Sequence, residues 1–260
     1  MSQSFTPFPE VNLVLEALLN NVPRLLKEQF VGIYLFGSLA NGGFDENSDV
    51  DVLIVTRDKI SSDVFSKLET MHSKISTLDS WCATQLEVVY IPRDAVQRYN
   101  PKNNIHPHLD RGRGEKLHQV QHDMDWVVQR FILRDRGITL VGPNPRTLID
   151  PVSLEDLRHA MRSVLYDWLA GFIDDPSQIK NHGYQSYIVL TICRVLYTLQ
   201  YGDIVSKQAA ANWAKESLDV RWIPLIERAW IGRQNPQGKA KPDEIKETQN
   251  LIRYALERGK

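Results

Sequence analysis

Residues 36–55, FGSLANGGFDENSDVDVLIV, place two carboxylates where an apolar strand begins, and this pattern constrains the fold more than any other in the chain. Side chains at positions i and i+2 of a strand lie on the same face, so Asp49 and Asp51 project together while Val50 and Val52 face the core. Two neighbouring carboxylates repel one another unless a cation lies between them. The pair therefore indicates either a divalent metal site or a strand edge, where Asp49 caps a turn and Asp51 pairs with a lysine.

Two further features favour the metal site. Gly37 and Ser38 directly follow the apolar run VGIYLF and suit a turn in which the backbone comes close to phosphate oxygens. Glu87 lies within a third apolar run, QLEVVYI, on the face opposite to its apolar neighbours, and its burial there is costly without a shared cation. Three carboxylates offer the hard oxygen ligands that Mg²⁺ prefers when it also carries nucleotide phosphates. The sequence therefore predicts a Mg²⁺ site at Asp49, Asp51 and Glu87.

The spacing of apolar residues divides the chain into two parts. Up to about residue 145, apolar β-branched runs typical of strands alternate with amphipathic stretches typical of helices. After VGPNPRTLIDP the apolar residues recur with a helical period, over roughly 153–174, 184–201, 206–217, 221–232 and 242–258. The proline-rich segment is typical of a hinge. We therefore expect an α+β protein, with an α/β domain over residues 1–150 and an all-α helical bundle over residues 151–260.

The net charge, the N-terminal segment, the length of the apolar runs and the spacing of the cysteines argue against several classes of protein. A net charge of −1 over 260 residues indicates no broad electrostatic affinity for nucleic acid or for a membrane surface. The N-terminus has no basic segment followed by an uninterrupted apolar core, and no apolar run approaches the length that spans a bilayer. Cys82 and Cys193 lack CxxC spacing, which favours buried thiols over a disulfide or a zinc site. We expect a cytoplasmic protein.

Four histidines lie between residues 100 and 126, but their spacing does not match a metal site. His106, His108, His118 and His122 are not accompanied by an HExxH motif, and the segment around the first pair is rich in proline and asparagine. We therefore expect a polar surface loop. The segment DRGRGEK, residues 110–116, is either an anion-binding turn or, as we favour, a mobile connection.

The opening segment and the helical half together resemble a known family. GSLANGGFDENSDVDVL resembles the nucleotidyltransferase signature, in which Gly-Ser is followed about ten residues later by Asp-x-Asp, with a further acidic residue on a later strand. IVLTICRVLYTLQYGDIVSKQAAANWA is similar to the C-terminal segment of the bacterial aminoglycoside adenylyltransferases that modify streptomycin and spectinomycin. The resemblance spans essentially the whole chain. It implies a nucleotidyltransferase domain with a small mixed sheet and a helical substrate-binding domain.

The resemblance also implies an activity, which is Mg²⁺-dependent transfer of AMP from ATP to a hydroxyl of an aminoglycoside or aminocyclitol, with release of pyrophosphate. Asp49 and Asp51 would ligate Mg²⁺, and Glu87 would act as general base and as a partner of the metal site. The residues that would contact the nucleotide are Gly37, Ser38, Ser48, Asp125, Lys207 and Trp230. ATP would lie in a cleft between the two domains. Residue type alone favours a solvated lysine at 207 and a core aromatic at 230.

The chain departs from the family pattern where the drug binds. The family has a tryptophan after the third strand and acidic residues before the helix that begins here with IVLTI. This chain has no tryptophan between Glu87 and Trp126 and no carboxylate between Asp175 and Asp203. A cleft with fewer carboxylates attracts polycations less strongly, and residues 184–187 offer rings and hydrogen bonds instead. We therefore expect spectinomycin to be modified in preference to streptomycin.

Three other functions are weighed against this one. A nucleotidyltransferase that AMPylates a protein or another small molecule is the main alternative, although the antitoxins of that type have one domain. A non-catalytic nucleotide sensor is expected to lack one of the three carboxylates, and all three are present. A nucleic-acid polymerase of the same superfamily needs a basic groove, which the near-neutral charge does not indicate.

Overall fold

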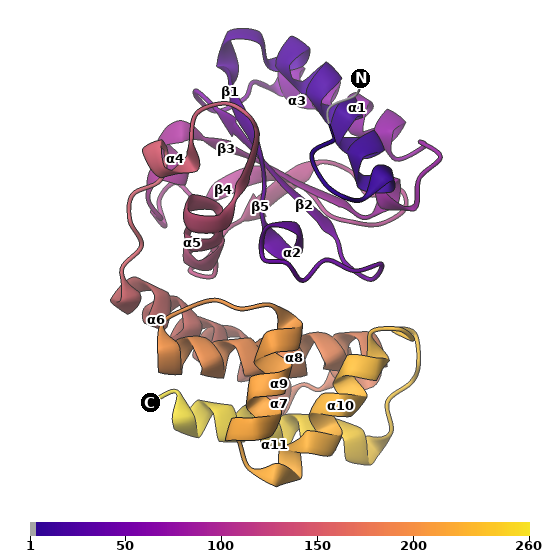
Figure 1. Cartoon of the computed structure of the whole chain (residues 1–260), viewed down its shortest axis with the longest axis vertical. Coiled ribbons are helices and arrows are strands. Elements are labelled where there is room, and N and C mark those ends of the chain that lie inside the picture. The colour runs from indigo at the N-terminus through magenta and orange to yellow at the C-terminus, as the bar shows by residue number, and fades with distance from the viewer. Residues whose placement is uncertain (1–3) are drawn as a thin grey trace. The chain divides into compact units, whose positions relative to one another are not determined.

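The apolar runs that begin at residues 30, 50 and 86 form adjacent strands of one mixed sheet. The structure, a computed structural model, describes residues 4–260 and consists of two compact units, Met1–Pro151 and Val152–Lys260 (Figure 1). In the first unit the strand order is β5-β4-β3-β2-β1-β6. The strands are β1 Phe30–Leu35, β2 Val50–Thr56, β3 Leu86–Pro92, β4 Ile105–Leu109, β5 His118–Gln121 and β6 Ile138–Val141. The β2 and β3 strands pair in parallel, and the other neighbours pair antiparallel.

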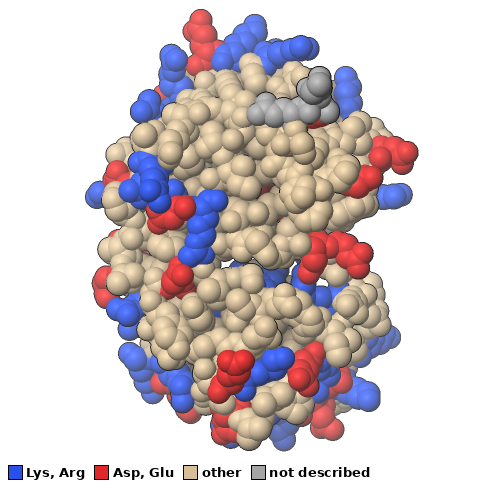
Figure 2. Space-filling model, in the orientation of Figure 1, with Lys and Arg blue, Asp and Glu red and all other residues tan. Residues whose placement is uncertain are grey.

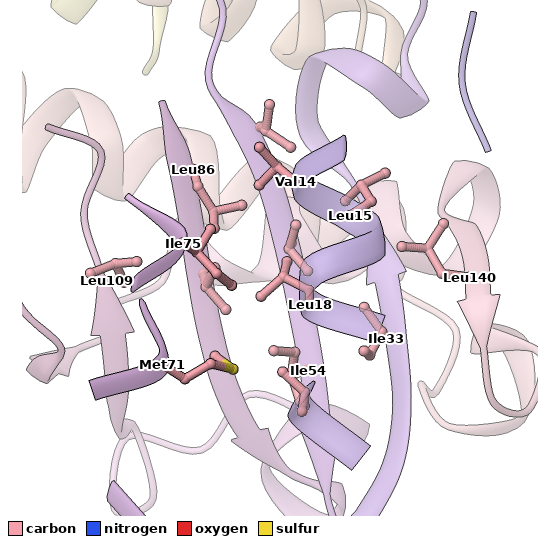
Figure 3. Close-up of a cluster of buried hydrophobic side chains, with 14 of the residues drawn as sticks. Val14, Leu15, Leu18, Ile33, Ile54, Met71, Ile75, Leu86, Leu109 and Leu140 are labelled. Atoms are coloured by element: carbon pink, nitrogen blue, oxygen red, sulfur yellow. The ribbon is translucent and has the colours of Figure 1, made fainter. Parts of the chain in front are cut away.

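Helices cover both faces of this sheet. They are α1 Pro9–Leu26, α2 Gly37–Ala40, α3 Ser62–Ile75, α4 Arg93–Gln97 and α5 Trp126–Arg136. The α1 and α3 helices lie together on one face (Figure 1). Figure 3 shows how Val14, Leu15 and Leu18 of α1 lie over Ile33 of β1 and Ile54 of β2. This face buries the continuous apolar core of the unit.

Alternation along β2 assigns its acidic residue to the other face. Val52 and Ile54 join the core under α1 and α3. Leu53 instead lines a small internal cavity with Trp126 and Leu133 of α5. Because side chains alternate along a strand, Asp51 lies on the α5 face together with Leu53. The functional residues therefore project away from the main core.

The second unit is helical, as the apolar period predicts. Its helices are α6 Leu154–Ser163, continued by a π-helical turn Val164–Leu169, α7 Gly171–Asp174, α8 His182–Tyr201, α9 Lys207–Ser217, α10 Ile223–Gly232 and α11 Pro242–Arg258. Two of the predicted helix starts, at residues 153 and 206, have side-chain caps. Ser153 and Asp156 form a capping box at α6, and the Ser206 hydroxyl accepts a hydrogen bond from the Ala209 amide at α9. An α/β unit with a mixed sheet followed by a helical unit confirms the predicted α+β fold class.

Residues 100–126 differ from the prediction. His106 and His108 do not lie in a polar surface loop but on β4, between β3 and β5, where they are 1% and 7% exposed. Pro107 in a run of only five residues hides the strand, because proline is unusual inside a sheet. Imidazoles also count as polar in a hydropathy pattern, although here they pack as rings. The prediction of a surface loop for these two histidines is therefore wrong.

Cys82 and Cys193 are both buried free thiols, as predicted. Within residues 4–260 no helix combines the length and the apolar character that crossing a membrane requires.

Candidate active site

The register between β2 and β3 brings three carboxylates together. Parallel pairing sets Asp51 directly beside Glu87, and Asp49 lies just before β2 begins. One ligand oxygen from each of the three residues lies within 4.8 Å of the others, and all three side chains are half-buried. Among residues 4–260 no other group of three or more His, Cys, Asp or Glu residues has this geometry. The distances suit a divalent cation held by hard oxygen ligands.

The absence of a side chain at Gly37 leaves room for the carboxylate of Asp51. Gly37 begins α2 with φ of +59°, in the left-handed region that favours glycine. A Cβ built at this position would lie 1.7 Å from Oδ2 of Asp51. The amide of Phe36 also donates to the Asp51 carbonyl at 3.2 Å. The turn and the carboxylate therefore fit only with glycine at position 37.

The two predicted serines have different surroundings. The Ser38 hydroxyl is buried and has no hydrogen-bond partner among the described residues. A buried polar atom without a partner is unusual, and it is expected where a ligand completes the site. The Ser48 hydroxyl instead donates to Oδ1 of Asp45 and accepts from the Asp45 amide, both at 3.0 Å. Ser48 thus closes the turn that leads into Asp49, and its contact with a triphosphate stays a prediction.

Two cationic or ionisable groups face the carboxylates from the segment that follows β3. Nη1 of Arg111 lies 3.4 Å from Oδ2 of Asp49. Nε2 of His108 lies 3.4 Å from Oε1 of Glu87 and 3.5 Å from Oδ1 of Asp110. Sequence reasoning missed both residues. The alternation of His106 and His108 was the available signal, because two side chains at i and i+2 share one face of a strand.

Behind this layer lies a buried group of rings. His122 stacks on Trp126, with ring centroids 3.8 Å apart, and its centroid lies 5.2 Å from that of His106. Burial lowers the pKa of His106 to about 4 and that of His122 to about 2, so both rings are neutral near pH 7. Among the described residues, these histidines do not belong to a group of three or more ligand atoms within 4.8 Å of one another. The rings support the floor of the site on the α5 side.

The remaining predicted nucleotide contacts are distributed over the two units. Asp125, an exposed residue, precedes α5 in the first unit. In the second unit Lys207 is the half-buried first residue of α9, and Trp230 lies on α10 with the Arg233 guanidinium 4.9 Å from its ring centroid. Neither unit alone assembles the three residues. Their contacts with ATP stay predictions.

Family models match both parts of the chain. The model for the nucleotidyltransferase domain matches residues 15–106. The model for the C-terminal domain of aminoglycoside adenylyltransferases matches residues 147–258. The first match contains the carboxylate triad and the Gly37–Ser38 turn, and the second contains Lys207 and Trp230.

Curated relatives match over most of the chain. A spectinomycin 9-adenylyltransferase of Staphylococcus aureus is 33% identical over 224 residues, which are 81% of this chain and 80% of the relative. A spectinomycin 9-adenylyltransferase of Campylobacter jejuni is 27% identical over 88% of each chain. An aminoglycoside (3'') (9) adenylyltransferase of Escherichia coli is 25% identical over 94% of each chain.

One solved structure has the same fold. It is the spectinomycin adenyltransferase AAD(9) of Enterococcus faecialis with ATP and spectinomycin, which aligns with a TM-score of 0.72 over 95% of this chain and 98% of that chain. The identity is 18%, so this likeness concerns the fold.

Proposed function

The chain belongs to the aminoglycoside adenylyltransferase family of the nucleotidyltransferase superfamily, and from this premise we propose that it transfers AMP from ATP to a hydroxyl of spectinomycin and releases pyrophosphate. The observation that carries the proposal is the triad of Asp49, Asp51 and Glu87, with ligand oxygens within 4.8 Å. The three carboxylates together supply the oxygen ligands that a metal–nucleotide complex requires.

The residues present fit a magnesium ion and a triphosphate. Three carboxylate oxygens supply hard ligands, and the unpartnered Ser38 hydroxyl supplies a donor beside them. Gly37 leaves room for the Asp51 carboxylate that a Cβ would displace. Asp49, Asp51 and Glu87 would hold the ion. When bound, Mg²⁺ supplies charge that stabilises the oxygens of the attacking and leaving groups.

The chain's own residues carry the rest of the reaction. The Gly37–Ser38 turn would hold the triphosphate, with the Ser38 hydroxyl as a donor. The acceptor hydroxyl oxygen forms the new bond to the α-phosphorus, the bond to the β-phosphate oxygen breaks, and pyrophosphate leaves. The Glu87 carboxylate accepts the hydroxyl proton, which is worth roughly 10²–10⁴-fold in rate for a well-placed general base.

Two observations support spectinomycin as the acceptor. The chain has neither a tryptophan between Glu87 and Trp126 nor a carboxylate between Asp175 and Asp203, which are the stretches where the family pattern implied by the resemblance has them. A relative that is 33% identical over 81% of this chain is named a spectinomycin 9-adenylyltransferase. Streptomycin carries guanidinium groups that pair best with carboxylates and aromatic faces. The absence of these residues therefore weakens binding of streptomycin more than binding of spectinomycin.

The test compares the two drugs side by side. Purified protein is supplied with ATP and Mg²⁺, and pyrophosphate release is measured with spectinomycin or streptomycin at matched concentrations. We expect release with spectinomycin that exceeds release with streptomycin, and no release when Asp49 and Asp51 are both changed to alanine. A streptomycin preference would contradict the proposed acceptor. Turnover with neither drug would contradict it too, and would favour AMPylation of a protein or of another small molecule.

A further inference from the structure

Arg111 lies against a residue of the carboxylate triad. It belongs to the connection between β4 and β5, residues 110–117, which the Gly112 amide ties to the Thr84 carbonyl at 2.8 Å. From there Nη1 of Arg111 reaches to 3.4 Å from Oδ2 of Asp49. The Arg111 side chain is 50% exposed and that of Asp49 is 24% exposed. The backbone of the connection is therefore held at Gly112, whereas the neighbouring Arg111 side chain is exposed to solvent.

This contact compensates a concentration of negative charge. Asp49, Asp51 and Glu87 lie close enough to repel one another strongly without a cation. An arginine guanidinium carries a positive charge, which Arg111 supplies at this point. The ion pair between Arg111 and Asp49 therefore acts as an internal counter-ion for the triad.

Arg111 cannot keep this position when a divalent cation binds. The ion would approach the Asp49 oxygens that Arg111 faces, and two cations held against one carboxylate repel each other. The exposed ion pair that Arg111 would give up stabilises the protein only weakly. Repulsion therefore exceeds the attraction, and the exposed guanidinium moves.

A nucleotide supplies a new partner at the same place. Its phosphates carry several negative charges, and the planar guanidinium donates two parallel hydrogen bonds to phosphate oxygens. We propose that Arg111 exchanges partners during the reaction: it neutralises Asp49 when no nucleotide is bound, and it donates to the polyphosphate once Mg²⁺ and ATP occupy the site. This inference rests on the proposed function, because it takes ATP as the substrate of the triad. It adds a phosphate-binding residue that belongs to the first unit.

The exchange has two opposite consequences for binding. Without nucleotide, Arg111 competes with a divalent ion for Asp49 and weakens its binding. With nucleotide, Arg111 strengthens binding of the metal–ATP complex. A residue with a structural role alone would not move the two affinities in opposite directions.

The experiment compares Arg111→Gln with Arg113→Gln. Arg113 is an exposed arginine two residues further along the same connection, and it lines a surface pocket with Trp81 and Thr84 that includes no residue of the triad. Binding of Mn²⁺ without nucleotide is followed by the electron paramagnetic resonance of the free ion. Binding of ATP is followed by calorimetry at saturating Mg²⁺ without an acceptor, so that neither measurement depends on turnover.

For Arg111→Gln we expect Mn²⁺ to bind about two- to fivefold more tightly, as loss of an exposed competing pair allows. We expect ATP with Mg²⁺ to bind about tenfold more weakly, the size of one charge-assisted hydrogen bond. Arg113→Gln should change neither affinity. An unchanged Mn²⁺ affinity, or an unchanged ATP affinity, in Arg111→Gln would overturn the exchange.

A failure of the proposed function would look different. Two results would show that the triad is not a metal site: the unmodified protein binds no Mn²⁺, or its Mn²⁺ binding is unchanged in Asp51→Asn. The proposed function would fail with either result. If Mn²⁺ and ATP bound as proposed and Arg111→Gln matched Arg113→Gln, only the partner exchange would be wrong.

Discussion

A single methyl group at residue 37 is enough to disturb the candidate active site. Gly37 has φ of +59°, and a Cβ there would meet Oδ2 of Asp51. Gly42 has φ of +69°, and a Cβ there would meet no atom within 4 Å. The two positions share the same backbone strain and differ in the collision with Asp51. They form a matched pair for testing whether the position of Asp51 matters.

We expect Gly37→Ala to weaken Mn²⁺ binding by about tenfold or more, because the new methyl group displaces the Asp51 carboxylate from the other two ligands. A factor of ten in affinity corresponds to about 1.4 kcal/mol. Gly42→Ala should bind Mn²⁺ as the unmodified protein does. Gly42→Ala should lose about 1 kcal/mol of the free energy of unfolding, since alanine is disfavoured at positive φ, and Gly37→Ala should lose more because of the collision with Asp51. Metal titration and urea unfolding measure the two quantities. Equal Mn²⁺ affinities in the two variants would show that Asp51 adjusts without loss.

Glu87 allows a second test at the scale of the residue. Glu87→Gln keeps the shape of the side chain but removes the proton acceptor, so pyrophosphate release should fall by at least about a hundredfold. ATP should still bind, because Asp49 and Asp51 remain. Glu46→Gln, at an exposed position in the turn before Asp49, removes the same charge nearby and should leave turnover unchanged. Undiminished turnover in Glu87→Gln would assign the base to another residue.

At the scale of the element, a buried hydrogen bond joins α3 to β3. Nε2 of His72 lies 2.7 Å from the hydroxyl of Tyr90, and His72 is 3% exposed. Burial lowers the pKa of His72 from 6.5 to about 3. The folded state therefore holds a neutral imidazole at pH values where the unfolded state binds a proton. This lowered pKa contributes stability that is fully present above pH 6.5 and is lost as the pH falls from 6.5 to about 3.

We expect the free energy of unfolding to decrease as the pH is lowered through this range, and His72→Gln to decrease less steeply. The difference in slope approaches about 1.4 kcal/mol per pH unit, the value for one proton. Urea unfolding at a series of pH values measures both slopes. The exposed His159→Gln should leave the slope as it is in the unmodified protein. Parallel slopes for His72→Gln and the unmodified protein would refute this account.

At the scale of the whole molecule, the distribution of charge bears on the polymerase alternative. Acidic and basic side chains are interspersed on the face drawn in Figure 2, and the net charge is −1. Non-specific binding to nucleic acid comes mainly from lysine and arginine contacts with phosphates. We expect no saturable binding of a labelled single-stranded oligonucleotide at low salt, measured by fluorescence anisotropy. Micromolar binding that weakens steeply with added salt would contradict this and would favour a nucleic-acid substrate.

Much of the architecture is encoded locally. The alternation of VDVLIVT and the period of IVLTICRVLYTLQY specify a strand and a helix, because each pattern buries its apolar side chains in only one of the two geometries. Asp49, Asp51 and Glu87 are conspicuous as carboxylates within apolar runs, where burial demands compensation. For these elements the order of residues is sufficient, and the structure agrees with the expectation.

The pairing of distant segments is not encoded in this way. Asp51 lies beside Glu87 because β2 and β3 pair in parallel with that register, and register depends on the packing of both faces of the sheet together. The same holds for β4, whose histidines look polar in sequence but are buried against the ring of His122, which stacks on Trp126 of α5. Arg111 meets Asp49 only because the β4–β5 connection returns to the start of β2. Local patterns thus determine which residues are charged and which strands form, whereas contacts between strands, which have no signature in any one segment, decide which charges meet.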